Sequence, residues 1–589
     1  MSFPFEGETH VVSDGGAASS AAGQIADPAV AASSAADLQR ARDYGWNERT
    51  NLDYDKLQQI GDSNEWLGAA QVYEWKDEYG DVAPEVPELE ALLYGTEQRV
   101  TEGGHRENLD EIEVLLEGPT KVAPIQKFED GGLHPVVLDN VKRCGYSKPT
   151  PIQAYTIPAV KLGHDVVGIA QTGSGKTAAY LIPIISALMG KAKKLRGPRP
   201  NAGTYDRRDN HVRAEPLVLV IVPTRELAVQ IFDEARRLCY RSMLRPCVSY
   251  GGFPLGQNIQ DLGKGCDILI GTCGRLKDLM SKPDVLSMNR VKYTVIDEAD
   301  EMLGDDWSDE LKVILGGGDA NEDADHVYMM FSATFPKGAR QVARDYMESH
   351  YLRIRVGRAG QAHKNIKQEI IEVDRNRARD AVYDLLFSME PARTLIFCNA
   401  KASVDLLDDY LYNKGLPTTS IHSDRSPRER EDAIRSFRVG SAPILIATGV
   451  SARGWDIKDV KHVINYELPS GMHGGIQEYV HRIGRTARIG NQGLATSFYN
   501  DRNEDIAQEL VNVLVECGQP VPDFLGHLKP ERTADIDFDD NSEDDGEVGN
   551  GFGDDDAWGA ESPAADDSEA ADAGFEADSS FEASAHSSW

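Results

Sequence analysis

The sequence contains few cysteines, and no two of them have the C-x-x-C spacing of a zinc site or a redox-active pair. Seven cysteines, an odd number, stand at positions 144, 239, 247, 266, 273, 398 and 517. We expect reduced side chains packed inside an intracellular protein. Apolar runs of 18 or more residues are absent, and the first residues lack a basic segment followed by an apolar one. Membrane-spanning and secreted classes are therefore not expected. Repeats of 20 to 50 residues are also absent, which argues against solenoids and propellers.

Basic residues are scarce at both ends of the 589-residue chain. Residues 1–120 carry 25 Asp and Glu against 7 Lys and Arg, and residues 534–589 carry 19 Asp and Glu with no Lys or Arg. The formal net charge of -34 therefore lies in these ends, and residues 121–533 carry only about +3. The acidic C-terminal end, rich in Ala, Ser and Gly, is predicted to be disordered because it has too little apolar surface to bury. We predict the same for residues 13–36.

The central region alternates short β-branched runs with longer segments that suit helices. The runs lie at 166–169, 217–222, 266–270, 293–296, 326–331, 394–397, 443–447 and 462–466. Continuous apolar runs of this length are typical of strands buried on both faces, so the pattern predicts two α/β domains with parallel sheets. A polar, glycine-bearing stretch at 353–361 is interpreted as their connector. The predicted organisation is an acidic, largely disordered extension at 1–120, domains at 121–355 and 367–530 with a linker at 356–366, and an acidic disordered tail at 531–589.

A glycine-rich turn follows the apolar run at 166–169. It reads Ala-Gln-Thr-Gly-Ser-Gly-Lys-Thr and departs from the phosphate-binding pattern G-x-x-x-x-G-K-[ST] only at its first position. Its glycines let backbone N–H groups face a phosphate, and the helix-compatible segment after it points its positive end to the same place. The sequence therefore predicts a nucleotide site in which Lys176 holds the β- and γ-phosphates and Thr177 helps to hold Mg²⁺. The candidate residues are Ala170, Gln171, Thr172, Gly173, Ser174, Gly175, Lys176 and Thr177.

An acidic cluster, Asp-Glu-Ala-Asp at 297–300, ends the apolar run at 293–296. Carboxylates at the carboxyl end of a buried strand lie where α/β sheets bind ligands. Such a cluster alone is more often a solvated turn, but this one follows a phosphate loop in the same alternating pattern. We therefore interpret Asp297 as orienting the hydrated metal and Glu298 as positioning the attacking water.

Further motifs follow in order along residues 120–530. They are Gly-Tyr-Ser-Lys-Pro-Thr-Pro-Ile-Gln at 145–153 with Phe128 upstream, Pro-Thr-Arg-Glu-Leu-Ala at 223–228, Gly-Gly at 251–252, Ser-Ala-Thr at 332–334, Ala-Arg-Gly-Trp-Asp at 452–456 and His-Arg-Ile-Gly-Arg-Thr-Ala-Arg at 481–488. With the two preceding motifs, this set resembles the DEAD-box ATP-dependent RNA helicases. The phrase Gln-Pro-Val-Pro-Asp-Phe-Leu at 519–525 and the basic insert at 191–213 look most like the Vasa-like branch. The resemblance implies two tandem RecA-like domains.

The resemblance also implies roles for residues of the nucleotide site. Gln153 would recognise the adenine edge, with Tyr146 stacking on the base and Phe128 nearby. Asp456 would contact the ribose. Arg485 and Arg488 would reach the γ-phosphate from the second domain, a task that suits the planar, permanently charged guanidinium. The implied cofactors are ATP and Mg²⁺.

RNA contacts and coupling residues follow from the same resemblance. Small and cationic side chains would bind the RNA backbone without reading sequence, and both ligands would favour closure of the two domains, with local strand separation. The implied RNA-contacting residues are Pro223, Thr224, Arg225, Gly252, Thr272, Gly274, Arg275, Thr448 and Arg453. The implied coupling residues are Ser332, Thr334, Asp300 and His481.

Several positions depart from the family's pattern. Cys273 replaces a proline and removes the ring that fixes φ in an RNA-facing turn. Ala487 replaces a glycine, so its turn is either in an ordinary conformation or strained. Pro427, Gly449 and Trp455 also stand where relatives usually have other residues. Since Lys176, Glu298, Arg485 and Arg488 are retained, these departures put RNA coupling in more doubt than ATP hydrolysis.

Other interpretations remain open from the sequence. A nucleotide-gated RNA clamp fits the same motifs as a helicase, whereas a DNA helicase and an inactive scaffold fit them less well. The tails suit a solubilising role or the docking of protein partners, and the aromatic segment 73–79 suits docking or an extra helix. The basic insert at 191–213 suits duplex RNA, a solvated loop or a nuclear-import signal. We expect a monomer that binds RNA and no membrane, acts on mRNA in translation initiation, and is cytoplasmic, with nuclear shuttling and ribosome assembly left open.

Overall fold

A computed structural model describes residues 28–47, 49, 82–95, 114–171, 173–189, 195, 197–200, 212–302, 308–316, 326–335, 337–348, 350–357, 365–449, 459–487 and 492–530. Both predicted α/β domains are present among them. The acidic tail at 531–589 and residues 13–27 and 73–79 lie outside the described residues.

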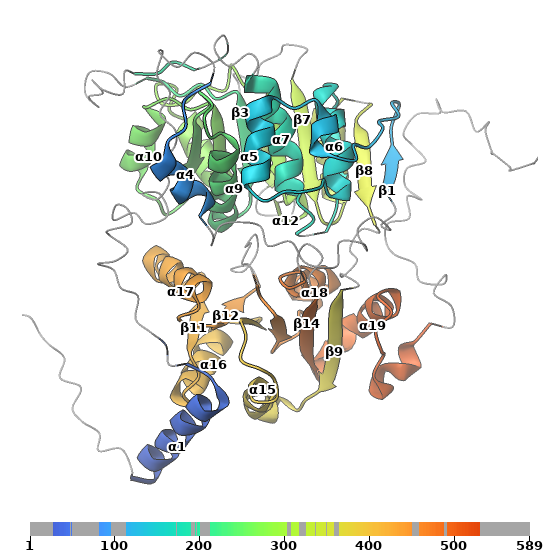
Figure 1. The fold of residues 1–589 in the computed structure, drawn as a ribbon. Helices are drawn as coiled ribbons and strands as arrows, with labels where there is room; N and C mark the ends of the chain where they lie inside the picture. The colour runs from blue at the N-terminus through green and yellow to red at the C-terminus, as the bar shows by residue number, and fades with distance from the viewer. Residues whose placement is uncertain are drawn as a thin grey trace, which may run out of the picture. The chain divides into compact units, whose positions relative to one another are not determined.

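The first domain is built on an eight-stranded sheet with the order β1-β8-β2-β7-β6-β3-β5-β4 (Figure 1). All neighbours run parallel except β1 and β8, which pair antiparallel. The strands are β1 (Val114–Glu117), β2 (Val166–Ile169), β3 (Val218–Val222), β4 (Pro246–Ser249), β5 (Ile268–Thr272), β6 (Tyr293–Asp297), β7 (Val327–Ser332) and β8 (Leu352–Val356). Because the parallel strands all end at one edge of the sheet, the loops that follow them gather there.

Helices cover both faces of this sheet. Alternate residues of β3 illustrate this, because Val218 and Val220 pack into one core and Leu219 and Ile221 into the other. The first face is covered by α5 (Pro135–Arg143), α6 (Pro151–Lys161), α7 (Lys176–Met189) and α9 (Arg225–Leu238) (Figure 1). The second face is covered by α10 (Leu255–Leu262), α11 (Cys273–Met280), α12 (Ala299–Met302), α13 (Ser308–Leu315) and α14 (Lys337–Tyr346).

The second domain has a six-stranded, wholly parallel sheet with the order β11-β12-β10-β13-β14-β9. Its strands are β9 (Ile366–Glu372), β10 (Thr394–Cys398), β11 (Thr418–Ile421), β12 (Ile444–Thr448), β13 (His462–Asn465) and β14 (Gly493–Tyr499). One face packs against α15 (Ala378–Leu386) and α16 (Lys401–Asn413), the other against α17 (Pro427–Val439), α18 (Gly475–Ile483) and α19 (Ala507–Glu516). Both domains are therefore RecA-like α/β layers, as predicted.

Two neighbouring strands of the first sheet, β8 and the edge strand β1, correct two sequence interpretations. Residues 353–356, interpreted as part of the connector, belong to β8, where buried and half-buried residues alternate along the strand. Arg353 and Arg355 share its half-buried face, which gives the strand its polar composition. Strand β1 (Val114–Glu117) likewise lies inside the segment predicted to be a largely disordered extension, and it closes the sheet by pairing with β8.

The extension also contains helices where disorder was predicted, and the prediction for residues 13–36 is wrong for residues 28–36, which lie in helix α1 (Pro28–Tyr44). Helix α1 has Ala41 buried, and Trp46 just beyond it is buried as well, both in the core of the second domain. The guanidinium of Arg40 lies 5.2 Å from the ring centroid of Tyr383 and 4.5 Å from that of Phe387. The segment is thus packed on the α15 and α16 side of the second domain (Figure 1).

All seven cysteines are free and buried, which confirms that they are packing residues. Among the residues that the structure describes, no helix is both long enough and apolar enough to cross a membrane.

Candidate functional site

The phosphate loop joins the end of β2 to the start of α7. Gly173 and Gly175 have φ of 76° and 88°, in the left-handed region that glycine adopts without steric cost. A Cβ on Gly175 would lie 2.5 Å from Gln153 Nε2, so this position also has no room for a side chain. The loop thus has the tight backbone geometry that the sequence predicts.

Lys176 is the first residue of α7 and is buried. Within the described part of the chain, its Nζ has no hydrogen-bond partner, and neither has Ser174 Oγ. A buried ammonium without an acceptor is costly, and here it stands at a helix N-terminus, which favours anions. A nucleotide phosphate fits both features. Thr177, beside it, is half-buried.

The acidic cluster lies at the end of β6, next to the phosphate loop. Burial raises the pKa of Asp297 to about 6, although the charge of Lys176 and a hydrogen bond from Tyr180 act to lower it. The Tyr180 hydroxyl donates to Asp297 Oδ2 at 2.9 Å. A divalent cation near this carboxylate would favour its ionised form, so the residues present fit Mg²⁺ together with a nucleotide.

Glu298 follows Asp297 in an unusual backbone conformation, with φ of 54°. For a residue with a long side chain such a conformation is strained, and strain of this kind is concentrated at functional sites. Burial acts to raise the pKa of Glu298, but the charges of Arg485 and Lys176 outweigh it, so the pKa lies below its ordinary value. Glu298 is therefore ionised and able to accept a proton or orient a water.

The segment predicted to recognise adenine connects α5 to α6. Phe128 is buried, and its ring centroid lies 6.4 Å from that of Tyr146. Gln153 is also buried. Its Oε1 accepts from the Thr150 N–H at 3.0 Å, and its Nε2 donates to the Gly175 carbonyl at 3.1 Å. Besides the predicted role at the adenine edge, Gln153 thus ties this segment to the phosphate loop, a contact that spacing alone does not reveal.

The predicted coupling residues meet at one place. The Asp300 N–H donates to Ser332 Oγ at 3.2 Å, and Asp300 Oδ2 accepts from the N–H and Oγ1 of Thr334 at 3.1 and 2.9 Å. His481 Nε2 of α18 lies 3.6 Å from the same oxygen. Burial acts to raise the pKa of Asp300, but the hydrogen bond and charge of His481 lower it well below its usual range. Asp300 is thus ionised and shared between elements of both domains.

The second-domain arginines are only partly described. Arg485 is buried, and its Nε donates to the His481 carbonyl at 3.1 Å. The positive charge of Arg485 lowers the pKa of Glu298. Arg488, Asp456, Arg453 and Thr172 lie outside the described residues.

The predicted RNA-contacting residues lie where parallel strands end. Pro223, Thr224 and Arg225 follow β3, Thr272 ends β5, and Thr448 ends β12. Gly252, exposed with φ of 89°, stands in the turn after β4, and Gly274 is exposed at the start of α11.

Thr224 and Arg275, which belong to the predicted RNA-contacting set, also make internal contacts. Thr224 Oγ1 accepts from the Leu227 N–H at 3.3 Å and caps α9. The guanidinium of Arg275 donates to Asn258 Oδ1 at 3.2 Å and to the Phe253 carbonyl at 2.7 Å. Arg275 therefore holds the loop that follows Gly252.

One contact between the domains was not predicted from the sequence. Arg430 of α17 donates to Glu226 Oε1 at 2.5 Å, and about a tenth of each side chain is exposed. Burial raises the pKa of Glu226, while the charge of Arg430 opposes that shift. The sequence feature that could have indicated this contact is Glu226, the acidic residue inside the Pro-Thr-Arg-Glu motif.

The structure gives the local setting of several departures from the family's pattern. Pro427 begins α17 directly after the capping residue Ser426, where proline is favourable. Cys273 is buried and its sulfur lies 3.8 Å from that of Met302 in α12. Ala487 has φ of 55°, so of the two alternatives its turn is the strained one. Trp455 lies outside the described residues.

Comparison with known protein families matches residues 150–342 to the DEAD/DEAH box helicase family and residues 377–490 to the helicase conserved C-terminal domain. Together these ranges take up just over half of the chain. The fold and the site thus define a RecA-like, nucleotide-dependent helicase core. The chain belongs to the DEAD-box helicase family, and it is an RNA-dependent ATPase and helicase by class.

Solved structures of this family are similar to the chain. S. cerevisiae Dbp5 bound to RNA and ADP BeF3 is 26% identical, with 67% of this chain and 95% of that chain covered and a TM-score of 0.56. Mss116p bound to ssRNA and AMP-PNP is 25% identical, covering 67% and 85%, with a TM-score of 0.54. A DEAD box protein from the hyperthermophile Methanococcus jannaschii is 32% identical, covering 68% and 99%, with a TM-score of 0.39.

Proposed function

We propose that the chain hydrolyses ATP with Mg²⁺ when RNA is bound, and that this cycle separates short RNA duplexes or remodels RNA–protein complexes. The observation that carries the proposal is the buried ammonium of Lys176, which lacks an acceptor among the described residues and acts on the buried carboxylates of Asp297 and Glu298. A buried cation that lacks a hydrogen-bond acceptor, with two acids beside it, suits a nucleotide phosphate and a metal ion.

Each group has a distinct task in this proposal. Lys176 and the loop N–H groups bind the phosphates, Thr177 and Asp297 hold Mg²⁺ in part through water, and Glu298 orients the attacking water. Mg²⁺, when bound, would neutralise charge on the phosphates. Arg485 and Arg488 stabilise the charge that develops on the γ-phosphate from the second domain.

The RNA-facing residues would bind backbone rather than bases. Threonine hydroxyls, glycine N–H groups and an arginine approach phosphates closely and carry no sequence information. Dbp5 and Mss116p, which are bound to RNA in their structures, support RNA as the ligand here. The cluster of Asp300, Thr334 and His481 would couple nucleotide binding to RNA binding, because it links the acidic motif of the first domain to His481 of the second.

The cellular role is proposed on the resemblance to the Vasa-like branch. We infer action on mRNA during translation initiation in the cytoplasm, by a monomer whose acidic ends dock protein partners. A translation extract depleted of the protein tests this role. We expect reduced initiation on messages with structured leaders and restoration by the wild-type protein only. Equal translation of structured and unstructured leaders would contradict the proposal.

Steady-state ATP hydrolysis tests the enzymatic function. Purified full-length protein is assayed alone, with single-stranded RNA and with DNA of equal length. We expect stimulation by RNA only, and a loss of roughly a hundredfold or more in Glu298→Gln, because a positioned base contributes about that much to such rates. Glu504→Gln, an exposed acid of the second domain, is the matched control.

Two further outcomes decide what the hydrolysis is used for. ATP-dependent displacement of a short RNA strand supports the helicase function. Tight RNA binding that persists through hydrolysis without displacement supports an RNA clamp instead. If hydrolysis is indifferent to RNA, the coupling proposed here is wrong.

A further inference from the structure

Residues 82–94 of the acidic extension form an ordered segment packed on the first domain. The segment ends in helix α4 (Pro87–Tyr94), which starts with proline and has an acidic first turn, as suits a helix N-terminus. Leu89 and Leu93, one turn apart, are buried together with Tyr94 in the core that underlies α5 and α9. The segment is therefore part of the folded domain, although it precedes the nucleotide-binding motifs by more than fifty residues.

Backbone hydrogen bonds hold the segment on the turn that follows α9. The Ala83 N–H donates to the Arg241 carbonyl at 3.1 Å, and Arg241 Nε donates to the Ala83 carbonyl at 2.9 Å. The Val86 N–H donates to the Tyr240 hydroxyl at 2.9 Å. Because backbone groups of the segment or of the turn take part in all three hydrogen bonds, these bonds fix where the backbone of residues 83–86 lies on the turn after α9.

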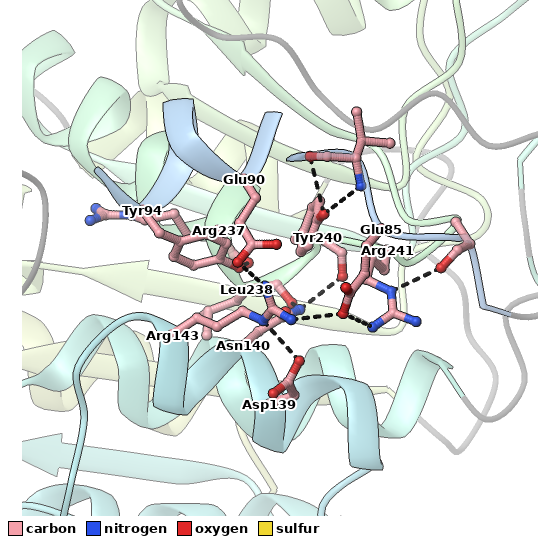
Figure 2. A network of polar contacts seen from close by, with 12 residues as sticks. Glu85, Glu90, Tyr94, Asp139, Asn140, Arg143, Arg237, Leu238, Tyr240 and Arg241 are labelled. Atoms are coloured by element: carbon pink, nitrogen blue, oxygen red, sulfur yellow. Dashed lines mark hydrogen bonds and ion pairs between the residues drawn. The ribbon is translucent and has the colours of Figure 1, made fainter. Parts of the chain in front are cut away.

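Arg143, the last residue of α5, is the charged centre of the contact (Figure 2). Its guanidinium pairs with Glu85 at 2.9 Å, with Glu90, and with Asp139 of its own helix at 2.8 Å. The Arg143 side chain is 19% exposed, so solvent screens these pairs only in part. Two of its three partners come from the extension, and the extension thus holds the C-terminus of α5.

The C-terminus of α5 leads directly to the ring that we propose to stack on adenine. Tyr146 stands three residues after Arg143, and its N–H donates to the Val141 carbonyl at 3.2 Å, back into the last turn of α5. Gly145 between them has φ of 88°, the left-handed conformation that ends helices. A shift of the α5 terminus would therefore move Tyr146.

A second route reaches the same ring through α9. The Tyr94 hydroxyl donates to the Arg237 carbonyl at 2.6 Å. Arg237 forms an ion pair with Glu234 at 3.0 Å, and Glu234 Oε1 accepts from the Tyr146 hydroxyl at 2.6 Å. Helix α4 is thus connected to Tyr146 both along the backbone of α5 and through side chains of α9.

We propose that residues 82–94 are a positioning element for the adenine pocket, with Glu85, Glu90 and Tyr94 fixing the ring of Tyr146 through Arg143 and α9. This inference rests on the proposed ATP hydrolysis and names a further determinant of nucleotide affinity in the same site. The contacts given above join the segment to α5, α9 and the turn after α9, and not to the groups assigned to phosphate chemistry. Its loss should therefore weaken nucleotide binding more than the chemical step.

Full-length variants test the proposal. Tyr94→Phe removes one hydrogen bond, Glu85→Gln with Glu90→Gln removes the charges on Arg143, and Glu88→Gln, an exposed acid of the same helix, is the control. For each test variant we expect KM for ATP and the dissociation constant of a fluorescent ADP analogue to rise roughly two- to tenfold, as for one lost hydrogen bond. The value of kcat with saturating RNA should change less than about twofold, and Glu88→Gln should match the wild type.

A double-mutant cycle separates positioning from general destabilisation. If Tyr94 acts on the ring through Glu234, the effects of Tyr94→Phe and Tyr146→Phe on nucleotide affinity should be less than additive, because both break one chain of contacts. Additive effects, or KM values equal to the control, would overturn the inference. A wild-type protein that does not hydrolyse ATP would instead overturn the proposed function, and affinity for the ADP analogue would still report on the segment.

Discussion

Gly449 provides a sharp test of packing next to the second-domain motifs. The resemblance to the DEAD-box family implies aspartate there, but a Cβ at this position would lie 2.0 Å from Glu478 Oε1 and 3.0 Å from an Arg482 nitrogen. Glu478 and Arg482 form a nearly fully buried ion pair at 2.9 Å. Gly449→Asp must displace the Glu478 carboxylate and adds a like charge to it. Breaking a buried pair typically costs about 3 to 5 kcal/mol, and we expect roughly 3 kcal/mol here.

A compensating change makes the prediction specific. In Gly449→Asp with Glu478→Ala, the new carboxylate has room and can pair with Arg482, so most of the lost stability should return. A loss of roughly 3 kcal/mol lowers the midpoint of thermal unfolding by about 6 to 12 °C in a domain of this size. The assay is thermal unfolding of the full chain, with Gly526→Asp as control because a Cβ there meets no atom within 4 Å. Additive losses in the double variant would refute the reasoning.

Four further predictions concern the nucleotide site and the coupling residues next to it. Burial raises the pKa of Asp297 in the folded protein to about 6, so the folded protein without nucleotide keeps a proton on this carboxyl between about pH 4 and 6, where the unfolded chain loses it. The stability that this group contributes is therefore lost as pH rises through that window. Unfolding midpoints measured across this pH range for the wild type and for Asp297→Asn check this prediction. Affinity for Mg²⁺-ADP should fall below about pH 6 for the same reason, as titration calorimetry would show. Tyr180→Phe removes a bond that lowers this pKa, so the acidic limb of the pH–rate profile should move to higher pH. Thr334→Val removes a hydroxyl bond to Asp300 and should reduce the RNA-stimulated rate roughly tenfold, measured as kcat with saturating RNA.

The buried strands were the most predictable part of the fold. All eight apolar runs coincide with strands of the two sheets, because a strand covered on both faces must be apolar along its whole length. Strands β1 and β8, at one side of the first sheet, carry no such signal. Strand β8 alternates arginine with apolar residues, and β1 is exposed in part, so composition alone made one a connector and the other a piece of the extension.

The site was predictable to the extent that its chemistry depends on local sequence. The phosphate loop and the acidic turn each consist of a few consecutive residues at the end of a strand, and the types of these residues determine the chemistry of each motif. Contacts between distant segments were not predictable. The bond from Gln153 to the Gly175 carbonyl and the pair of Glu226 with Arg430 join residues 22 and 204 positions apart. Nothing in the local patterns selects these partners over others.

The acidic extension shows why net charge is a poor guide to order. Its excess of carboxylates predicts disorder, yet Glu85 and Glu90 pair with Arg143, and Asp37 pairs with Lys414 at 2.7 Å. The acids compensate cations that the folded domains present, and interspersed apolar residues such as Leu93 are buried beside them. Charge counted along one segment omits the opposite charge that the fold brings to it. The relevant signal was therefore two apolar residues one turn apart next to acidic residues, a pattern typical of an amphipathic helix with an apolar face to bury.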